Sequence, residues 1–140
     1  MYLIDTNVIS EARKGARSDA GVRAFFAKVA ADGAPVFISV ITVGELRRGV
    51  ELIRHRGDAE QAGRLEQWLR GVVEEYQDHL LCFDHDAAQV WGRLRVPRPE
   101  NLLDKQIAAT ALLHDLTVVT RNERDFIGTG ARTMNPFEGA

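Results

Sequence analysis

Short apolar runs recur along the chain and predict β-strands. They show little of the alternation between apolar and polar residues that marks a half-exposed strand, so we expect helices to cover both faces of the sheet. The runs are Met1–Ile4, Val36–Ile38, Leu80–Phe83 and Leu116–Thr120, with a weaker one near Ala131–Thr133.

Longer segments between these runs repeat apolar residues every three to four positions, which predicts helices. They are a segment from Asp5 through Glu11, Asp19 to about Ala31, Thr42 to about His55, Asp58 to about Asp78, Asp86 to about Leu94, and Leu103 to about Leu113. Strands that alternate with helices favour right-handed crossovers and a mostly parallel sheet. The predicted fold class is therefore α/β, a three-layer α/β/α sandwich formed by a single domain over residues 1–140.

The composition excludes several classes of protein. A chain of 140 residues that is 45% hydrophobic builds a core without disulfides, and the single cysteine, Cys82, lies in an apolar run where we expect it to be buried. No apolar run approaches the roughly 20 residues that cross a bilayer, and no basic leader opens the chain, so we expect a cytoplasmic protein without a membrane partner. The net charge of −2 argues against a protein that coats nucleic acid, but not against an enzyme that grips phosphates locally.

Two acidic residues lie at the predicted start of the chain's first and third helices. Asp5 follows the first strand directly, where an aspartate is often only a helix N-cap, although Thr6 and Asn7 offer alternative caps. Glu45 borders the apolar face of its helix. On spacing alone, an ion pair with Arg48 is the simpler explanation for Glu45.

Two further acids lie in the C-terminal part. Asp104 heads a helical stripe whose other members are Ile107, Ala108, Ala111 and Leu112. A carboxylate there is costly unless something satisfies it, and a first-turn acid that complements the helix dipole is an equally good explanation. Asp125 follows the turn after the strand that ends at Thr120, a place where aspartate is usually structural.

Together, the four acids form a pattern that none of them forms alone. Strand ends and the helix starts that follow them meet at one edge of a parallel sheet. Carboxylates packed together repel one another, and a divalent cation reverses that repulsion. A site of oxygen ligands without nearby Cys or His suits Mg²⁺ or Mn²⁺ rather than Zn²⁺. Such an ion activates water and neutralises charge on a phosphate.

Four motifs occur in an order and at a spacing that resemble PIN-domain proteins, especially the VapC-type toxins of bacterial toxin–antitoxin pairs. The resemblance runs through almost the whole chain. The motifs are Tyr2–Ser10, Ser39–Gly49, Asp104–Ala111 and Val118–Asn122 with Asp125-Phe126, followed by the ending Asn135-Pro136-Phe137.

This resemblance implies a role for each acid. Asp5 and Asp104 would bind the metal most directly, Glu45 would help to hold the metal or orient the attacking water, and Asp125 would act directly or through water. Polar residues around them would fix the carboxylates as a second layer of contacts. These are Thr6, Asn7, Thr120 and Asn122.

The resemblance also implies the activity and the partners. VapC-type proteins are typically ribonucleases, usually homodimers, each held inactive by a cognate antitoxin protein. The corresponding reaction is hydrolysis of RNA by metal-activated water, leaving a 5′-phosphate and a 3′-hydroxyl. The helix with Trp68 and Tyr76 offers a dimer face or an antitoxin groove, although core packing is the simpler interpretation.

Basic residues flank the acidic motifs, as contacts to an RNA backbone require, although a solvated surface explains most of them. The candidates for RNA contact are Arg48, Lys105 and Arg121. Lys105 departs from the family pattern, where a small residue often follows the third acid, and we expect it on the surface.

Three rival functions are weighed against this prediction. A metal-free ribonuclease would use a histidine pair, but the four histidines lie outside the acidic motifs. A PIN-like interaction module without catalysis predicts damaged acid positions, whereas all four acids are present. A nuclease that acts on DNA remains an open alternative, because the chemistry at phosphorus is the same.

Overall fold

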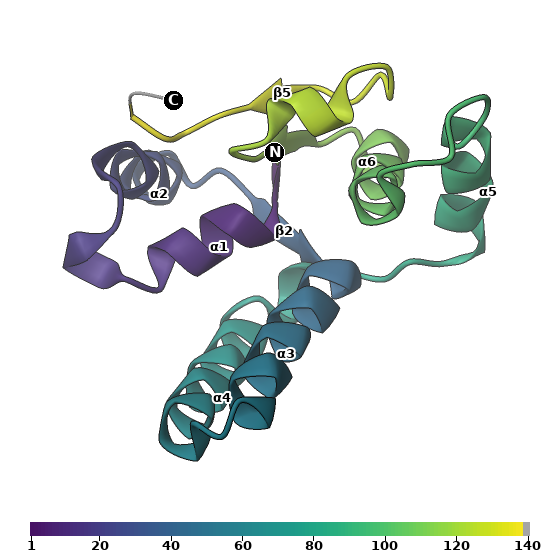
Figure 1. Ribbon diagram of the computed structural model, residues 1–140. Helices are drawn as coiled ribbons and strands as arrows, with labels where there is room; N and C mark the ends of the chain where they lie inside the picture. The colour runs from purple at the N-terminus through teal and green to yellow at the C-terminus, as the bar shows by residue number, and fades with distance from the viewer. Residues whose placement is uncertain (139–140) are drawn as a thin grey trace.

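The computed structural model describes residues 1–138, and Figure 1 shows a central sheet with helices on both sides. Gly139 and Ala140, which the predicted domain includes, lie outside the described residues. All strand pairings are parallel, in the order β3-β2-β1-β4-β5. The predicted α/β class with a parallel sheet is therefore confirmed. The strands are β1 (Tyr2–Ile4), β2 (Val36–Ser39), β3 (Leu80–Leu81), β4 (Thr117–Val119) and β5 (Thr133–Met134).

Six α-helices in the described part of the chain surround this sheet. In Figure 1, α1 and α2 lie on one side of the sheet, α5 and α6 lie on the other, and α3 packs along α4. Within residues 1–138, no helix has the length and apolar character needed to cross a membrane. The helices are α1 (Thr6–Ala12), α2 (Ala20–Asp32), α3 (Val40–His55), α4 (Ala59–Glu75), α5 (His85–Leu94) and α6 (Leu102–His114).

The core divides into two clusters because neighbouring residues of a strand point to opposite faces of the sheet. Leu3 and Val118 pack with apolar residues of α6 on one face. Ile4 and Val119 pack with residues of α1, α2, α3 and α4 on the other. This two-sided burial explains why the apolar runs lack a polar alternation.

The strand register determines where the polar residues meet. Ile4 on β1 pairs with Val119 on β4, so the next residues, Asp5 and Thr120, leave the sheet side by side. On the other side of β1, strand β2 ends at Ser39, whose hydroxyl caps α3 by accepting from the Ile41 amide at 3.0 Å. The carboxyl ends of strands β1, β2 and β4 therefore lie at the same edge of the sheet.

Several sequence-based predictions differ from the structure at element boundaries; the final strand, expected near Ala131–Thr133, is Thr133–Met134. The helix expected to reach Asp78 ends at Glu75 and gives way to a 3-10 turn over Gln77–His79. The strand expected over Leu80–Phe83 ends at Leu81. Cys82 therefore lies in the connection to α5 and is exposed, so the prediction that it is buried was wrong.

Candidate active site

Asp5 lies at the edge of the sheet where β1, β2 and β4 end, and it is almost fully buried, with 4% of its surface exposed. Its Oδ1 accepts from the Thr6 amide at 2.9 Å, and its Oδ2 accepts from the Thr120 hydroxyl at 2.8 Å and from Asn7 Nδ2 at 3.3 Å. Burial raises the pKa of the Asp5 carboxyl, while the hydrogen bond from Thr120 works in the opposite direction. Asp5 itself is the N-cap of α1, so Thr6 and Asn7 do not take that role.

Asn7 joins the end of β1 to the loop after β4. Its Nδ2 lies 3.3 Å from both Asp5 Oδ2 and Thr120 Oγ1, and its Oδ1 accepts from the Arg121 amide at 3.0 Å. The Thr120 hydroxyl oxygen in turn accepts from the Asn122 amide at 3.0 Å. Asn7 and Thr120 thus hold the Asp5 carboxylate in place, whereas Asn122 contributes its backbone to this network.

Glu45 reaches the same edge from the second turn of α3. The Thr6 hydroxyl donates to Glu45 Oε1 at 2.9 Å, so one residue of the first motif connects Asp5 to Glu45. Glu45 is half-buried, and burial, followed by the charge of Asp5, raises its pKa. The simple ion pair with Arg48 that the spacing suggested is not among those formed within residues 1–138.

Asp104 lies in the first turn of α6 and is half-buried. Burial raises the pKa of its carboxyl to about 6, and the charges of Asp5, Asp125 and Glu45 add to this effect. The buried stripe below it holds Ile107, Ala108 and Ala111, as predicted. Leu112 is 38% exposed, because a residue eight positions along a helix is rotated by about 80° from the first.

Asp125 completes the group from a 3-10 turn over Glu123–Phe126, which follows β4. Its amide donates to the Asn122 carbonyl at 3.0 Å, so the turn is closed by its own backbone. The charge of Asp125 contributes to the raised pKa values of both Asp5 and Asp104. The structure thus brings together residues from four separate segments of the chain.

The donor set has the chemistry of a site for a hard divalent cation. Its charged groups are all carboxylates, and burial together with mutual repulsion raises the pKa values of Asp5, Glu45 and Asp104. Within residues 1–138, no three acidic, His or Cys side chains already stand at the spacing of a metal cage.

The three candidate cations for RNA contact differ in their placement. Arg48 and Arg121 are exposed. Lys105 is only 7% exposed, and its Nζ donates to the backbone carbonyl of Arg98. The expectation that Lys105 lies on the surface was therefore wrong: its ammonium fastens the loop before α6 to that helix.

Sequence reasoning missed Thr42. This residue is fully buried, and its Oγ1 lies 3.4 Å from the Thr6 hydroxyl, so it supports the contact between Thr6 and Glu45. Its position three residues before Glu45 places both side chains on the same face of α3. The three-residue spacing between Thr42 and Glu45 was the signal in the sequence that could have identified Thr42.

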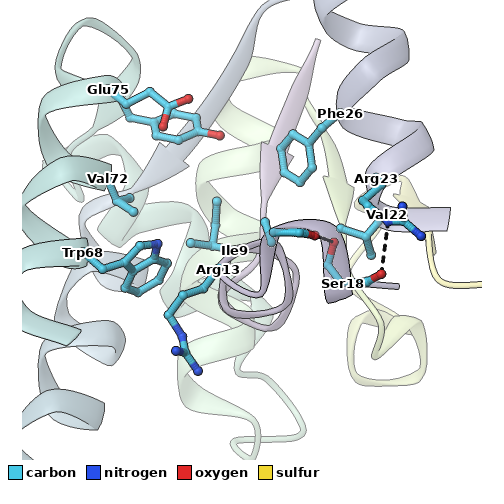
Figure 2. A pocket seen from close by; sticks show the side chains of 12 residues that line it. Ile9, Arg13, Ser18, Val22, Arg23, Phe26, Trp68, Val72 and Glu75 are labelled. Carbon is cyan, nitrogen blue, oxygen red and sulfur yellow. Dashed lines mark hydrogen bonds between the residues drawn. The ribbon is translucent and has the colours of Figure 1, made fainter. Parts of the chain in front are cut away.

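An apolar pocket of about 460 Å³ lies away from these acids, between α1, α2 and α4, and Figure 2 shows its lining. Ile9, Phe26, Trp68 and Val72 point into it, while Arg13, Arg23 and Glu75 lie at its edges. None of the four acids lines this pocket. Trp68 and Tyr76 also pack against the buried core, as the simpler interpretation of that helix predicted.

In a parallel α/β sheet the carboxyl ends of the strands are the usual place of a ligand site, and carboxylates gathered there are the groups with which proteins hold divalent cations against phosphate esters. A model of the PIN domain family matches residues 2–130. Toxin FitB of Neisseria gonorrhoeae is 33% identical, over 98% of this chain and 99% of that protein. VapC ribonuclease Y4jK of Sinorhizobium fredii is 33% identical over 100% of both.

The fold of a solved relative is also similar. The crystal structure of FitAcB from Neisseria gonorrhoeae matches with a TM-score of 0.81 at 31% identity, over 97% of this chain and 98% of that one. The chain belongs to the PIN domain family, in its VapC/FitB group of toxins from type II toxin–antitoxin systems. The family that the ordered motifs predicted is confirmed.

Proposed function

We propose that this protein is a metal-dependent endoribonuclease, the toxin of a toxin–antitoxin pair. One observation carries the proposal: four carboxylates from four segments lie near one another at the same edge of the sheet. Burial, and then the charges of the other three acids, raise the pKa of Asp104. Such an arrangement is unfavourable without a cation. Its full-length similarity to a VapC ribonuclease indicates RNA as the substrate.

The residues of the acidic site would have different roles. Asp5 and Asp104 would hold the metal directly, Glu45 would hold it or orient the attacking water, and Asp125 would act directly or through water. Thr6, Asn7 and Thr120 keep these carboxylates in place through the hydrogen bonds described above. Asn122 supports the same loop through its backbone.

Mg²⁺ or Mn²⁺ suits this site because every charged donor is a carboxylate. When bound, the cation would lower the pKa of a water molecule and neutralise charge on the phosphate. Water then attacks phosphorus, the bond to the 3′ oxygen breaks, and that oxygen takes up a proton. The products are a 5′-phosphate and a 3′-hydroxyl.

A cleavage assay tests the activity. Single-stranded RNA is incubated with the protein in Mg²⁺, in Mn²⁺ and in EDTA, and then with Asp5→Asn. The exposed Asp78→Asn is the matched control. We expect cleavage only with metal, and only in the wild type and the control. Undiminished cleavage in EDTA would refute the metal-dependent mechanism.

The same assay separates the two alternatives. Cleavage of single-stranded DNA in preference to RNA of matched sequence would favour a nuclease that acts on DNA. A protein that cleaves neither substrate in any metal would favour a non-catalytic interaction module.

The partner proposed for the toxin is its cognate antitoxin. The pocket in Figure 2 is apolar inside, with Arg13, Arg23 and Glu75 at its edge. Arg17 and Lys14, which pairs with Glu11, lie near Arg13, so cations outnumber acids on this surface. It therefore suits an apolar segment of the antitoxin with an acidic neighbour. We further propose a cytoplasmic homodimer of single-domain subunits over residues 1–140, which sedimentation of the purified protein tests.

Growth of a bacterial host tests the partnership. Expression without the neighbouring open reading frame should arrest growth, and co-expression of that neighbour should relieve the arrest. Arg13→Glu should weaken the relief while leaving the toxin active, because it reverses a charge at the pocket edge. The control is Arg56→Glu, at the C-terminal end of α3. Equal relief with both variants would contradict docking at this pocket.

A further inference from the structure

A second pocket, of about 360 Å³, adjoins the acidic site on the side of Asp125. All six residues that line it are polar or charged: Arg121, Asn122, Glu123, Arg124, Asp125 and Asn135. We propose that this pocket binds one nucleotide of single-stranded RNA next to the phosphate that is cleaved. The proposal rests on the ribonuclease function and adds a subsite to it.

The walls of this polar pocket are fastened to the acidic site. The Arg121 amide donates to Asn7 Oδ1 at 3.0 Å, while Nδ2 of the same Asn7 contacts Asp5. The Asn122 amide donates to the hydroxyl oxygen of Thr120, which binds Asp5 as well. A nucleotide held in the pocket is therefore held at a fixed place relative to the carboxylates, as a productive substrate requires.

Two arginines in the pocket form no direct ion pair within residues 1–138, although the charge of Arg121 contributes to lowering the pKa of Asp19. Ion pairs within residues 1–138 occupy other arginines, such as Arg47 and Arg54, but neither Arg121 nor Arg124. The Arg121 guanidinium lies over the Phe137 ring, with its Cζ 4.6 Å from the ring centre. Guanidinium groups bind phosphate oxygens in a planar, two-point manner, so these side chains suit the RNA backbone.

Two carboxylates also line the pocket and would repel a phosphate. Glu123 Oε2 accepts a 2.6 Å hydrogen bond from the Thr133 hydroxyl. Asp125 belongs to the acidic site, where a bound cation would neutralise its charge. With the cation present, the arginines outweigh the remaining negative charge at the pocket.

The amides favour a nucleotide over a bare phosphate. Asn135 Oδ1 accepts from the Phe137 amide at 3.0 Å, which directs the side chain and leaves its NH₂ group to donate. Amide side chains pair with the edges of unstacked bases. The volume of about 360 Å³ lies near the lower end of small-molecule pockets, which run from about 300 to 1,000 Å³, so it suits a single nucleotide.

RNA binding in Ca²⁺, a hard cation that takes the place of Mg²⁺ or Mn²⁺ on the carboxylates, tests the subsite apart from catalysis. Fluorescence anisotropy of a labelled single-stranded RNA decamer is measured with the wild type, Arg124→Gln, Asn135→Ala and the control Arg56→Gln. Arg56 is exposed and follows the 16-residue helix α3, about 24 Å from the helix start at the acidic edge. We expect Arg124→Gln to weaken binding about tenfold and to reduce the salt slope by about one.

Asn135→Ala should weaken binding without changing the salt slope, because it removes an uncharged group. With Mn²⁺ present, both variants should raise KM and leave kcat close to that of the wild type. Unchanged binding by both variants would overturn the subsite, and so would an equal loss with Arg56→Gln. Failure of the ribonuclease function appears differently, as a wild type that binds RNA but never cleaves it.

Discussion

The hydroxyl of Thr120 donates a 2.8 Å hydrogen bond to Oδ2 of Asp5, and both residues are buried although 115 positions separate them in the chain. They follow the paired residues Val119 and Ile4 on neighbouring parallel strands. The sheet register therefore delivers the threonine to the carboxylate. This contact makes the end of β4 part of the acidic site rather than a neighbouring loop.

Thr120→Val tests that contact because valine keeps the shape of threonine and removes the donor. Asp5 Oδ2 then retains only the longer hydrogen bond from Asn7. Groups that orient metal ligands typically contribute about 10–100-fold in metal affinity or activity, so we expect a loss of that size in Mn²⁺ affinity and in kcat/KM. Thr120→Ser should recover most of both. A valine variant with wild-type Mn²⁺ affinity would contradict the role of Thr120.

The pKa of Asp104 predicts how stability depends on pH. Burial and the neighbouring acids raise it to about 6 in the folded protein, against an ordinary value of 3.8. Between these values the metal-free folded state binds more protons than the unfolded state, so the free energy of unfolding falls as pH rises. Thermal unfolding from pH 4 to 7 measures this slope.

Asp104→Asn should flatten the slope and raise the unfolding midpoint of the metal-free protein near pH 7. Some slope should remain, because burial also raises the pKa values of Asp5 and Glu45. Saturating Mn²⁺ should stabilise the wild type more at pH 7 than at pH 5, since protons compete with the metal for the carboxylates. A wild-type midpoint that rises with pH in EDTA would contradict the raised pKa.

The sheet could be predicted from the sequence because its strands are buried on both faces and therefore appear as uninterrupted apolar runs. The acidic site could be predicted because parallel strands end at a common edge and the motifs occur in family order. The support given to Glu45 by Thr6 could not be predicted from the sequence, because a side-chain contact joins two residues that are 39 positions apart.

Single residues at element boundaries were less predictable. Cys82 lies in an apolar run, but its burial depends on whether β3 extends past Leu81, and β3 does not. Lys105 has the composition of a surface residue. Its burial depends on the Arg98 carbonyl, which belongs to a loop whose path no pattern of apolar residues specifies.

The contact between Lys105 and that carbonyl predicts an effect on stability. Lys105→Met keeps the buried aliphatic stem and removes the ammonium, which leaves the Arg98 carbonyl without this donor. A hydrogen bond from a charged donor contributes about 1.5–3 kcal/mol. Because Arg98 is exposed and water can replace the donor, we expect urea unfolding to show a loss at the lower end of that range. Lys28→Met removes an exposed i,i+4 ion pair with Asp32, which solvent screens, and should change the stability much less. Equal losses in both variants would show that Lys105 behaves as a surface residue.

Gly21 links the stability of α2 to the C-terminal segment. A Cβ at this position would lie 2.1 Å from the Pro136 carbonyl oxygen and 2.8 Å from the Glu138 amide nitrogen, so Gly21→Ala must displace that backbone. We expect a loss of about 1–3 kcal/mol in the free energy of unfolding. The control is Gly63→Ala in α4, where a Cβ meets nothing within 4 Å and the better helix former should stabilise by about 0.5–1 kcal/mol.

The displaced segment includes Phe137, over whose ring the Arg121 guanidinium lies. Gly21→Ala should therefore also weaken RNA binding under conditions where the variant is fully folded, although Gly21 lies outside the polar pocket. Urea unfolding and RNA anisotropy, measured on both glycine variants, test the two effects together. If Gly21→Ala destabilises the protein but binds RNA like Gly63→Ala, the position of Phe137 does not control Arg121. If it is as stable as Gly63→Ala, the close approach of the C-terminal segment to α2 is itself wrong.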